Sequence, residues 1–342
     1  MAKRALFFLF VCFLFLACVK QPVYAQVKYV VIPEAPRPGD PLTVSINTEA
    51  KEAVLLVNGK QAAKARCFLI PGETITITLP QPEPEPQPRR GRNSRQAAQP
   101  APAPVQVIKQ PDVWTAVLAV PSTITGENAV IRLNNGNALV QEITITLAPR
   151  EFRSETIKLT PALTSLVSDP NPQRQKESER LWEILSTTGN EVYHWGQFVL
   201  PTASTRRTSQ FGTRRINQYA DGRAPTSIHA GVDFGTPTGS EVYACGRGKV
   251  ILSRMRIISG YSIIIEHAPG VYSIYYHLDK VIAQEDTIVE AGEVIGLSGS
   301  TGFSTGPHLH WELRVSTENT DPDVFVERPL IDKDLIISKI SE

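Results

Sequence analysis

Short runs in which apolar and polar residues alternate recur along most of this 342-residue chain, separated by Gly, Pro and Asn. They include LTVSIN, AVLLVNGK and TITITL early in the chain, and EVYACGRGKVILSRM and YSIIIEHAPGVYSIYYHL near its end. Such alternation is typical of half-buried strands, and the residues between the runs are those that favour turns. Helical periodicity is missing from residue 196 onward, so no helix of more than about two turns is expected there. The chain is therefore predicted to be all-β.

A change in composition marks an insertion in the first half. Residues 80–105 are rich in Pro, Gln, Arg and Ala and almost free of large apolar residues, which predicts a disordered or polyproline-like segment. Strand patterns resume after it. We therefore expect one immunoglobulin-like β-sandwich over residues 26–149 that carries residues 80–105 in one loop.

The second half is predicted to hold a linker, a domain and a tail. Within residues 150–195 the side chains of Leu181, Ile184 and Leu185 fall on one helical face, which predicts a linker with one amphipathic helix. Residues 196–330 have the size and the β-rich pattern of a single compact domain. Residues 331–342 are predicted to form a C-terminal tail.

The first residues have the pattern of an export signal. Lys3 and Arg4 precede an apolar run over residues 5–19, which is too short to cross a bilayer comfortably. The sequence is consistent with two ways of processing this signal. It is either cleaved after Ala25 or lipidated at Cys18, where FLAC resembles a bacterial lipobox. A plain anchor helix is the third reading. Either favoured ending predicts a protein exported to the periplasm or anchored in the envelope, with membrane contact only through the signal or the lipid.

Charge and cysteine content narrow the partners. The formal charge is +1, from 35 basic and 34 acidic residues, which argues against nucleic acid as a partner because phosphate binding needs a basic surface. No cysteine pair has metal-ligand spacing, so a metal site would use nitrogen and oxygen ligands.

Histidines near the C-terminus carry the strongest functional pattern. IHAGVDF supplies His229 and Asp233, SIYYHL supplies His277, and GPHLHWEL supplies His308 and His310. In a strand, alternate side chains share a face, so the last two project to the same side together with Glu312.

These residues suit a catalytic zinc site. Catalytic zinc commonly has three protein ligands and an open position, and His229, Asp233 and one histidine of the HxH pair would supply them. The other HxH histidine and His277 would remain for proton transfer and for stabilising an oxyanion. No HExxH helix is present, so histidines would have to act as the base.

Three segments resemble a known family: HAGVDFGTPTGSEVYACGRGKV, YSIYYHL and GEVIGLSGSTGFSTGPHLHWELR. Over about residues 198–325 the chain is similar to the lysostaphin/LytM-type zinc metallopeptidases, a family of cell-wall endopeptidases. The resemblance implies a small β-barrel-like domain with a groove for peptidoglycan peptides. It also implies one zinc ion held by His229, Asp233 and His310, with His308 and His277 as unligated catalytic histidines.

The resemblance has one departure and leaves alternatives open. SGYSIIIEH replaces the Gly-Tyr-Gly-Asn common in the family, so Tyr261 is either a groove residue or a packed aromatic. A zinc endopeptidase acting on stem or cross-link peptides of peptidoglycan is the leading hypothesis. The alternatives are a non-catalytic LytM-like activator or wall-binding module, and an active enzyme autoinhibited by residues 150–195. The bond cleaved and the oligomeric state are not indicated.

Overall fold

Two four-stranded antiparallel sheets form the first part of the computed structural model, which describes residues 27–78, 103 and 105–342. The predicted signal in residues 1–25, and the predicted insertion apart from residues 103 and 105, lie outside the described residues. The first sheet has the order β1 (Tyr29–Ile32), β2 (Pro41–Ile46), β8 (Val113–Ala119), β5 (Phe68–Ile70). The second has the order β10 (Ala138–Thr146), β9 (Asn128–Asn135), β3 (Glu52–Val57), β4 (Lys60–Arg66).

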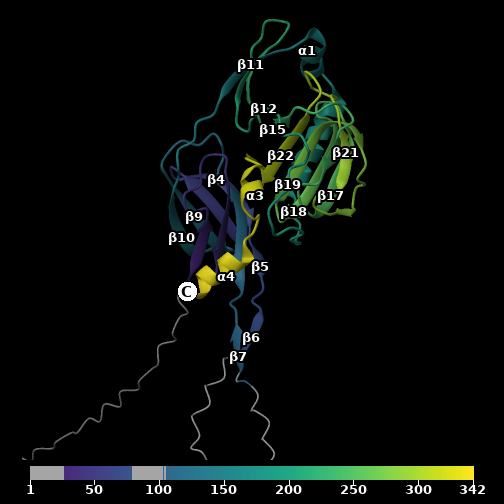
Figure 1. Ribbon diagram of the computed structural model, residues 1–342. Coiled ribbons are helices and arrows are strands. Elements are labelled where there is room, and N and C mark those ends of the chain that lie inside the picture. Colours follow the sequence, from purple (N-terminus) through teal and green to yellow (C-terminus); the bar gives the residue numbers. More distant parts are fainter. Residues whose placement is uncertain (1–26, 79–102, 104) are drawn as a thin grey trace, which may run out of the picture.

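The two sheets share one apolar core, to which β2, β3, β8 and β9 contribute Val44, Leu55, Leu118 and Ile131. Strands β6 (Thr74–Thr78) and β7 (Val105–Lys109) pair as a ribbon that projects away from the sandwich (Figure 1).

A short connecting region follows the sandwich. Strand β11 (Ser154–Lys158) pairs parallel with β13 (Arg214–Gln218), which pairs in turn with β14 (Thr226–Ile228). Where one linker helix was predicted, two helices lie between β11 and β13: α1 (Pro161–Ser168) and α2 (Pro172–Ser186). Pro170, together with Pro172 at the start of α2, separates them, and Ile184 and Leu185 of α2 are buried as the helical pattern predicted. Asn171 caps α2 by accepting hydrogen bonds from the first backbone N–H groups, and Pro172 starts the helix without losing a bond.

A ten-stranded sheet forms the last part of the chain. Its main path is β12 (Arg207–Ser209), β15 (Gly231–Phe234), β22 (Leu309–Val315), β19 (Val271–Val281), β18 (Gly260–Ala268), β17 (Gly248–Arg256), β20 (Ile288–Val289). Strands β16 (Glu241–Tyr243), β21 (Val294–Ser298) and β23 (Glu318–Thr320) pair at its margins. Strands dominate the described residues, and the all-β prediction is confirmed.

The sandwich and the large sheet are joined by a continuous apolar contact. Strand β8 is buried on both faces: Ala116 and Leu118 enter the sandwich core, whereas Val113 and Val117 pack in one cluster with Phe325. This explains why β8 reads as an almost unbroken apolar run rather than an alternating one.

Residues 331–342, predicted as a tail, contain helix α4 (Lys333–Ser341), and α3 (Val324–Glu327) precedes them. Ile336 and Ile340 of α4 are buried in the cluster that joins the two parts, and Figure 1 shows α4 lying against the sandwich. Among the described residues no helix is long and apolar enough to span a membrane.

Candidate metal centre and active site

Three neighbouring strands bring the predicted site residues together. In the register of β15 and β22, Asp233 lies opposite His310, and in the register of β19 and β22, Tyr276 lies opposite His310. His229 lies just before β15 and His308 just before β22. Four of the five residues therefore lie on or beside two paired strands, and His277 lies on the next one.

A glycine allows these strands to approach closely. A Cβ atom on Gly231 would lie 2.1 Å from the carbonyl oxygen of Trp311, a backbone atom that cannot move aside without breaking the strand. The glycine in IHAGVDF therefore follows from the tight pairing of β15 with β22.

The side chains of His229, Asp233 and His310 converge on one point. His229 Nε2 lies 3.0 Å from both Asp233 Oδ1 and His310 Nδ1, and His310 Nδ1 lies 2.7 Å from Asp233 Oδ1. All three side chains are buried. Within the described part of the chain, this is the group of three whose ligand atoms lie close enough to hold a metal ion.

The outer nitrogens of the two rings fix which nitrogens face the centre. His229 Nδ1 donates to the carbonyl oxygen of Gln210 (2.8 Å), and His310 Nε2 donates to Glu312 Oε1 (3.0 Å). A neutral imidazole carries one N–H, so His229 Nε2 and His310 Nδ1 each turn a lone pair toward Asp233. Three lone pairs at such distances repel one another unless a proton or a metal ion lies between them. Two imidazole nitrogens and a carboxylate oxygen match the ligands of catalytic zinc, and the outer partners match those that commonly orient them.

Electrostatics also favour a positive charge at this point. Burial lowers the pKa of His310, but hydrogen bonds with Asp233 and Glu312 outweigh it and raise that pKa to about 9. Burial raises the pKa of Asp233, and its contacts with His229 and His310 more than reverse this, so the carboxylate stays ionised. A metal ion would replace a proton in this arrangement.

His308 and His277 lie beside this centre with their rings 4.8 Å apart between centroids. His308 Nδ1 donates to the carbonyl oxygen of Gly306 (2.7 Å), and His277 Nδ1 donates to that of Thr301 (2.8 Å). Each ring therefore has its bare nitrogen at Nε2, and His308 Nε2 lies 3.8 Å from Asp233 Oδ1. Burial, followed by the neighbouring rings of His308 and His310, lowers the pKa of His277 to about 3, which keeps this ring neutral.

The backbone at His277 is unusual. Its φ is +60°, in the left-handed region that non-glycine residues seldom adopt, at a cost of about 1 kcal/mol or more. Its backbone N–H donates to the carbonyl oxygen of Ser259 (2.8 Å). This bond and the bond from the ring to Thr301 hold the conformation.

The histidines open into a pocket of about 190 Å³. Asp233, His277, His308 and His310 all line it, whereas Tyr261 does not. The backbone N–H of Tyr261 donates to Thr301 Oγ1, and the half-buried ring packs against the core.

Among the pocket residues that sequence reasoning missed, two contact the predicted metal ligands. Arg215 donates through Nη2 to Asp233 Oδ2 (2.9 Å), and the ring of Tyr276 stacks on His310 with centroids 5.6 Å apart. Tyr276 stands next to His277 in SIYYHL, which is the signal that could have found it. Arg215 belongs to QFGTRR, which lies within the stretch that resembles the family, but no local pattern pairs this arginine with Asp233.

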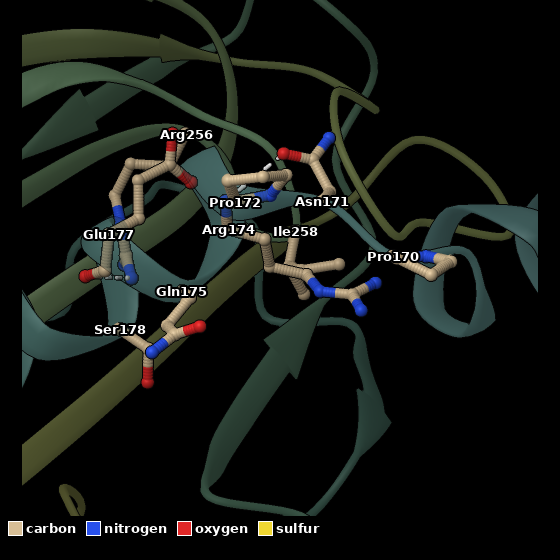
Figure 2. A pocket seen from close by; sticks show the side chains of 9 residues that line it. All are labelled: Pro170, Asn171, Pro172, Arg174, Gln175, Glu177, Ser178, Arg256 and Ile258. Carbon is tan, nitrogen blue, oxygen red and sulfur yellow. Dashed lines mark hydrogen bonds between the residues drawn. The ribbon is translucent and has the colours of Figure 1, made fainter.

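A second pocket of about 740 Å³ lies alongside. Figure 2 shows it between the first turns of α2 and the end of β17, where Glu177 lies beside Arg256. Ile258 lines both pockets, and Glu177 Oε2 accepts a hydrogen bond from the backbone N–H of Ile257 (2.8 Å). Helix α2 is thereby attached to the turn that leads to the active-site pocket.

The predicted site residues lie within a stretch that matches a known protein family. Residues 227–322 match the model of peptidase family M23. The chain contains a peptidase family M23 domain. A peptidoglycan DD-endopeptidase of Vibrio cholerae is 36% identical over 127 residues, which are 37% of this chain and 29% of that protein. The chain thus spans less than a third of the length of the curated relatives it matches first.

One solved structure extends the likeness to the fold. A Pseudomonas aeruginosa protein assigned to peptidase M23 superposes with a TM-score of 0.51 at 18% identity, over 85% of this chain and 94% of that one. This likeness concerns the fold alone and includes the N-terminal part. A zinc-containing peptidase from Vibrio cholerae is 38% identical over 37% of this chain and 39% of its own, with a TM-score of 0.34.

Proposed function

We propose that this protein is a zinc-dependent endopeptidase that hydrolyses stem or cross-link peptides of peptidoglycan outside the cytoplasm. The convergence of three possible ligand atoms, His229 Nε2, Asp233 Oδ1 and His310 Nδ1, is the observation that carries the proposal. The M23 domain and the peptidoglycan DD-endopeptidases among its relatives support the choice of substrate.

In this proposal His229, Asp233 and His310 hold one zinc ion. When bound, zinc supplies Lewis acidity, which polarises the scissile carbonyl and makes water a stronger nucleophile near neutral pH. Glu312 and the carbonyl of Gln210 keep the two ligand rings turned toward the metal.

We assign His308 as the general base. Its Nε2 is bare because Nδ1 donates to Gly306, and it lies 3.8 Å from Asp233 Oδ1, next to the metal position. His277 lies across the pocket with the same tautomer. The proton that His308 Nε2 takes from the attacking water can pass to the leaving amine. His277 Nε2 can donate to the oxyanion once it has received the second proton of the same water molecule. We assign this donor role to His277, and an exchange of the two roles uses the same geometry.

The test compares wild type and three single variants of the full chain on purified sacculi, with and without a chelator. Wild type is expected to release muropeptides only without chelator. His310→Ala is expected to lose zinc and activity. His308→Ala is expected to keep zinc and lose about 10²- to 10⁴-fold in rate, the usual contribution of a general base.

His194→Ala is the matched control, because His194 lies outside the pocket and makes its hydrogen bonds with Gln197 and Arg247. The proposal is wrong if zinc-loaded wild type releases no muropeptide. That outcome would favour the non-catalytic activator or wall-binding module. A His308→Ala variant as active as wild type would overturn the assignment of the base.

A further inference from the structure

The two carboxylate oxygens of Asp233 contact different partners. Oδ1 faces His229 and His310 at 3.0 and 2.7 Å, and Oδ2 accepts a hydrogen bond from Arg215 Nη2 at 2.9 Å. The side chain of Asp233 is 9% exposed and that of Arg215 is 19% exposed, so water competes weakly for this ion pair. Rotation about the last bond of an aspartate is otherwise broad.

Arg215 is itself held from the opposite side. Its Nε donates to Glu155 Oε1 at 2.6 Å, and Ser209 Oγ donates to the same oxygen at 3.1 Å. Backbone register explains why these groups meet. Glu155 of β11 lies directly opposite Arg215 of β13, and Ser209 of β12 lies opposite Asp233 of β15.

Glu155 and Arg215 both precede residues 227–322, the part that matches the family model. Glu155 belongs to the region that follows the sandwich, which the sequence suggested as a linker or as an inhibitor. In the structure, Glu155 of this region contacts Arg215, and Arg215 contacts the carboxylate of Asp233.

We propose that Arg215 is a positioning residue. It holds Asp233 so that only Oδ1 faces the metal, and Glu155 holds Arg215 in place. This inference rests on the proposed zinc site. A guanidinium presents two N–H groups in a fixed fork, so one side chain can bind Oδ2 and Glu155 together, whereas a lysine ammonium on a flexible stem cannot keep both directions. Without Arg215, the carboxylate is free to turn, and Oδ2 is left nearly buried without its hydrogen bond.

The experiment measures zinc affinity by competition with a chromophoric chelator, using the full chain. Arg215→Lys and Arg215→Ala are expected to raise the zinc Kd by about 10- to 100-fold, the usual effect of losing a partner of a metal ligand. Glu155→Ala is expected to act in the same direction and less strongly, because Arg215 retains its bond to Asp233. The lysine variant keeps the charge, so a loss of affinity there identifies orientation rather than charge as the cause.

The matched controls are Arg132→Lys and Glu142→Ala in the sandwich. Arg132 Nε and Glu142 Oε2 also form an ion pair, at 2.7 Å, but one that is exposed and far in sequence from the site. Both controls are expected to bind zinc as wild type does.

Two outcomes separate this inference from the proposed function. If wild type binds no zinc, both the positioning role and the zinc peptidase proposal are wrong. If wild type binds zinc and Arg215→Ala binds it equally or more tightly, the positioning role is refuted and the zinc peptidase proposal stands. Muropeptide release supplies a further readout: a positioning role predicts that excess zinc partly restores the activity of the variants, and activity that stays lost at saturating zinc also refutes it.

Discussion

Replacing Glu312 by Gln tests most directly whether a hydrogen bond from outside the proposed ligands holds His310 in place. Glu312 is 4% exposed and accepts from three donors: Oε1 from His310 Nε2 at 3.0 Å, and Oε2 from Arg314 Nε at 2.9 Å and Asn319 Nδ2 at 3.4 Å. A glutamine amide has one oxygen and one NH₂ group, so a donor must face a donor on one side.

Either orientation of the amide has a cost. If its nitrogen faces Arg314, a largely buried guanidinium loses its carboxylate. If its nitrogen faces His310, the ring must carry its proton on Nδ1, the nitrogen that faces Asp233, and it is lost as a ligand.

The expected cost is about 3 kcal/mol of unfolding free energy in the metal-free protein. This is the lower end of the range for breaking a buried ion pair, because the side chain of Arg314 is 15% exposed and Nη1 keeps a bond to the carbonyl of Thr317. Zinc affinity is expected to fall about 10- to 100-fold in addition.

Urea unfolding with and without zinc, together with chelator competition, measures both effects of the Glu312 substitution. Glu142→Gln serves as the control: it removes a carboxylate from an exposed pair and should change the unfolding free energy by less than about 0.5 kcal/mol. If Glu312→Gln unfolds like this control and binds zinc like wild type, the argument from buried donors is wrong.

Two further predictions concern stability. Zinc at about 100 times its Kd should raise the unfolding free energy by about 2.7 kcal/mol, so stripping the metal should lower the Tm, and a Tm unaffected by chelator would contradict binding to the folded state. Burial raises the pKa of Glu266, so its contribution to stability is present in acid and lost as pH rises through the carboxyl range. Glu266→Gln keeps an acceptor for Gly189 N–H and Tyr272 Oη–H, and its unfolding free energy should exceed that of wild type increasingly as pH rises toward neutrality; a pH-independent difference would refute this.

Local patterns were sufficient to predict many of the strands, though not β11 to β14, and to find the histidines. HLH alternates on β22, so His308 and His310 were expected on one face, and in the structure both rings lie near Asp233. These inferences need only the two-residue repeat of a strand and the chemistry of the side chains. The metal roles themselves remain predictions for the variants to test.

Contacts between segments distant in sequence were not predictable. Arg215 meets Glu155 because β11 and β13 pair in parallel across the two helices between them, and no short-range pattern sets such a register. The same reason applies to β8 and α4: only the packed structure shows that Val117 and Ile336 belong to the cluster that joins the sandwich to the large sheet.

The region between the sandwich and the M23 domain contacts the site in two opposed ways. Ile157 of β11 lines the pocket beside the histidines, a position that an inhibitory segment would also occupy. Two residues earlier on the same strand, Glu155 holds Arg215 against Asp233. Alternate residues of a strand project to the same side, so both effects arise from one face of β11. Under the proposed zinc site, removal of β11 is therefore expected to open the pocket and to weaken zinc binding at the same time. Under that proposal, inhibition by this region would be relieved by a side-chain or segmental displacement that leaves the pairing of Glu155 with Arg215 intact.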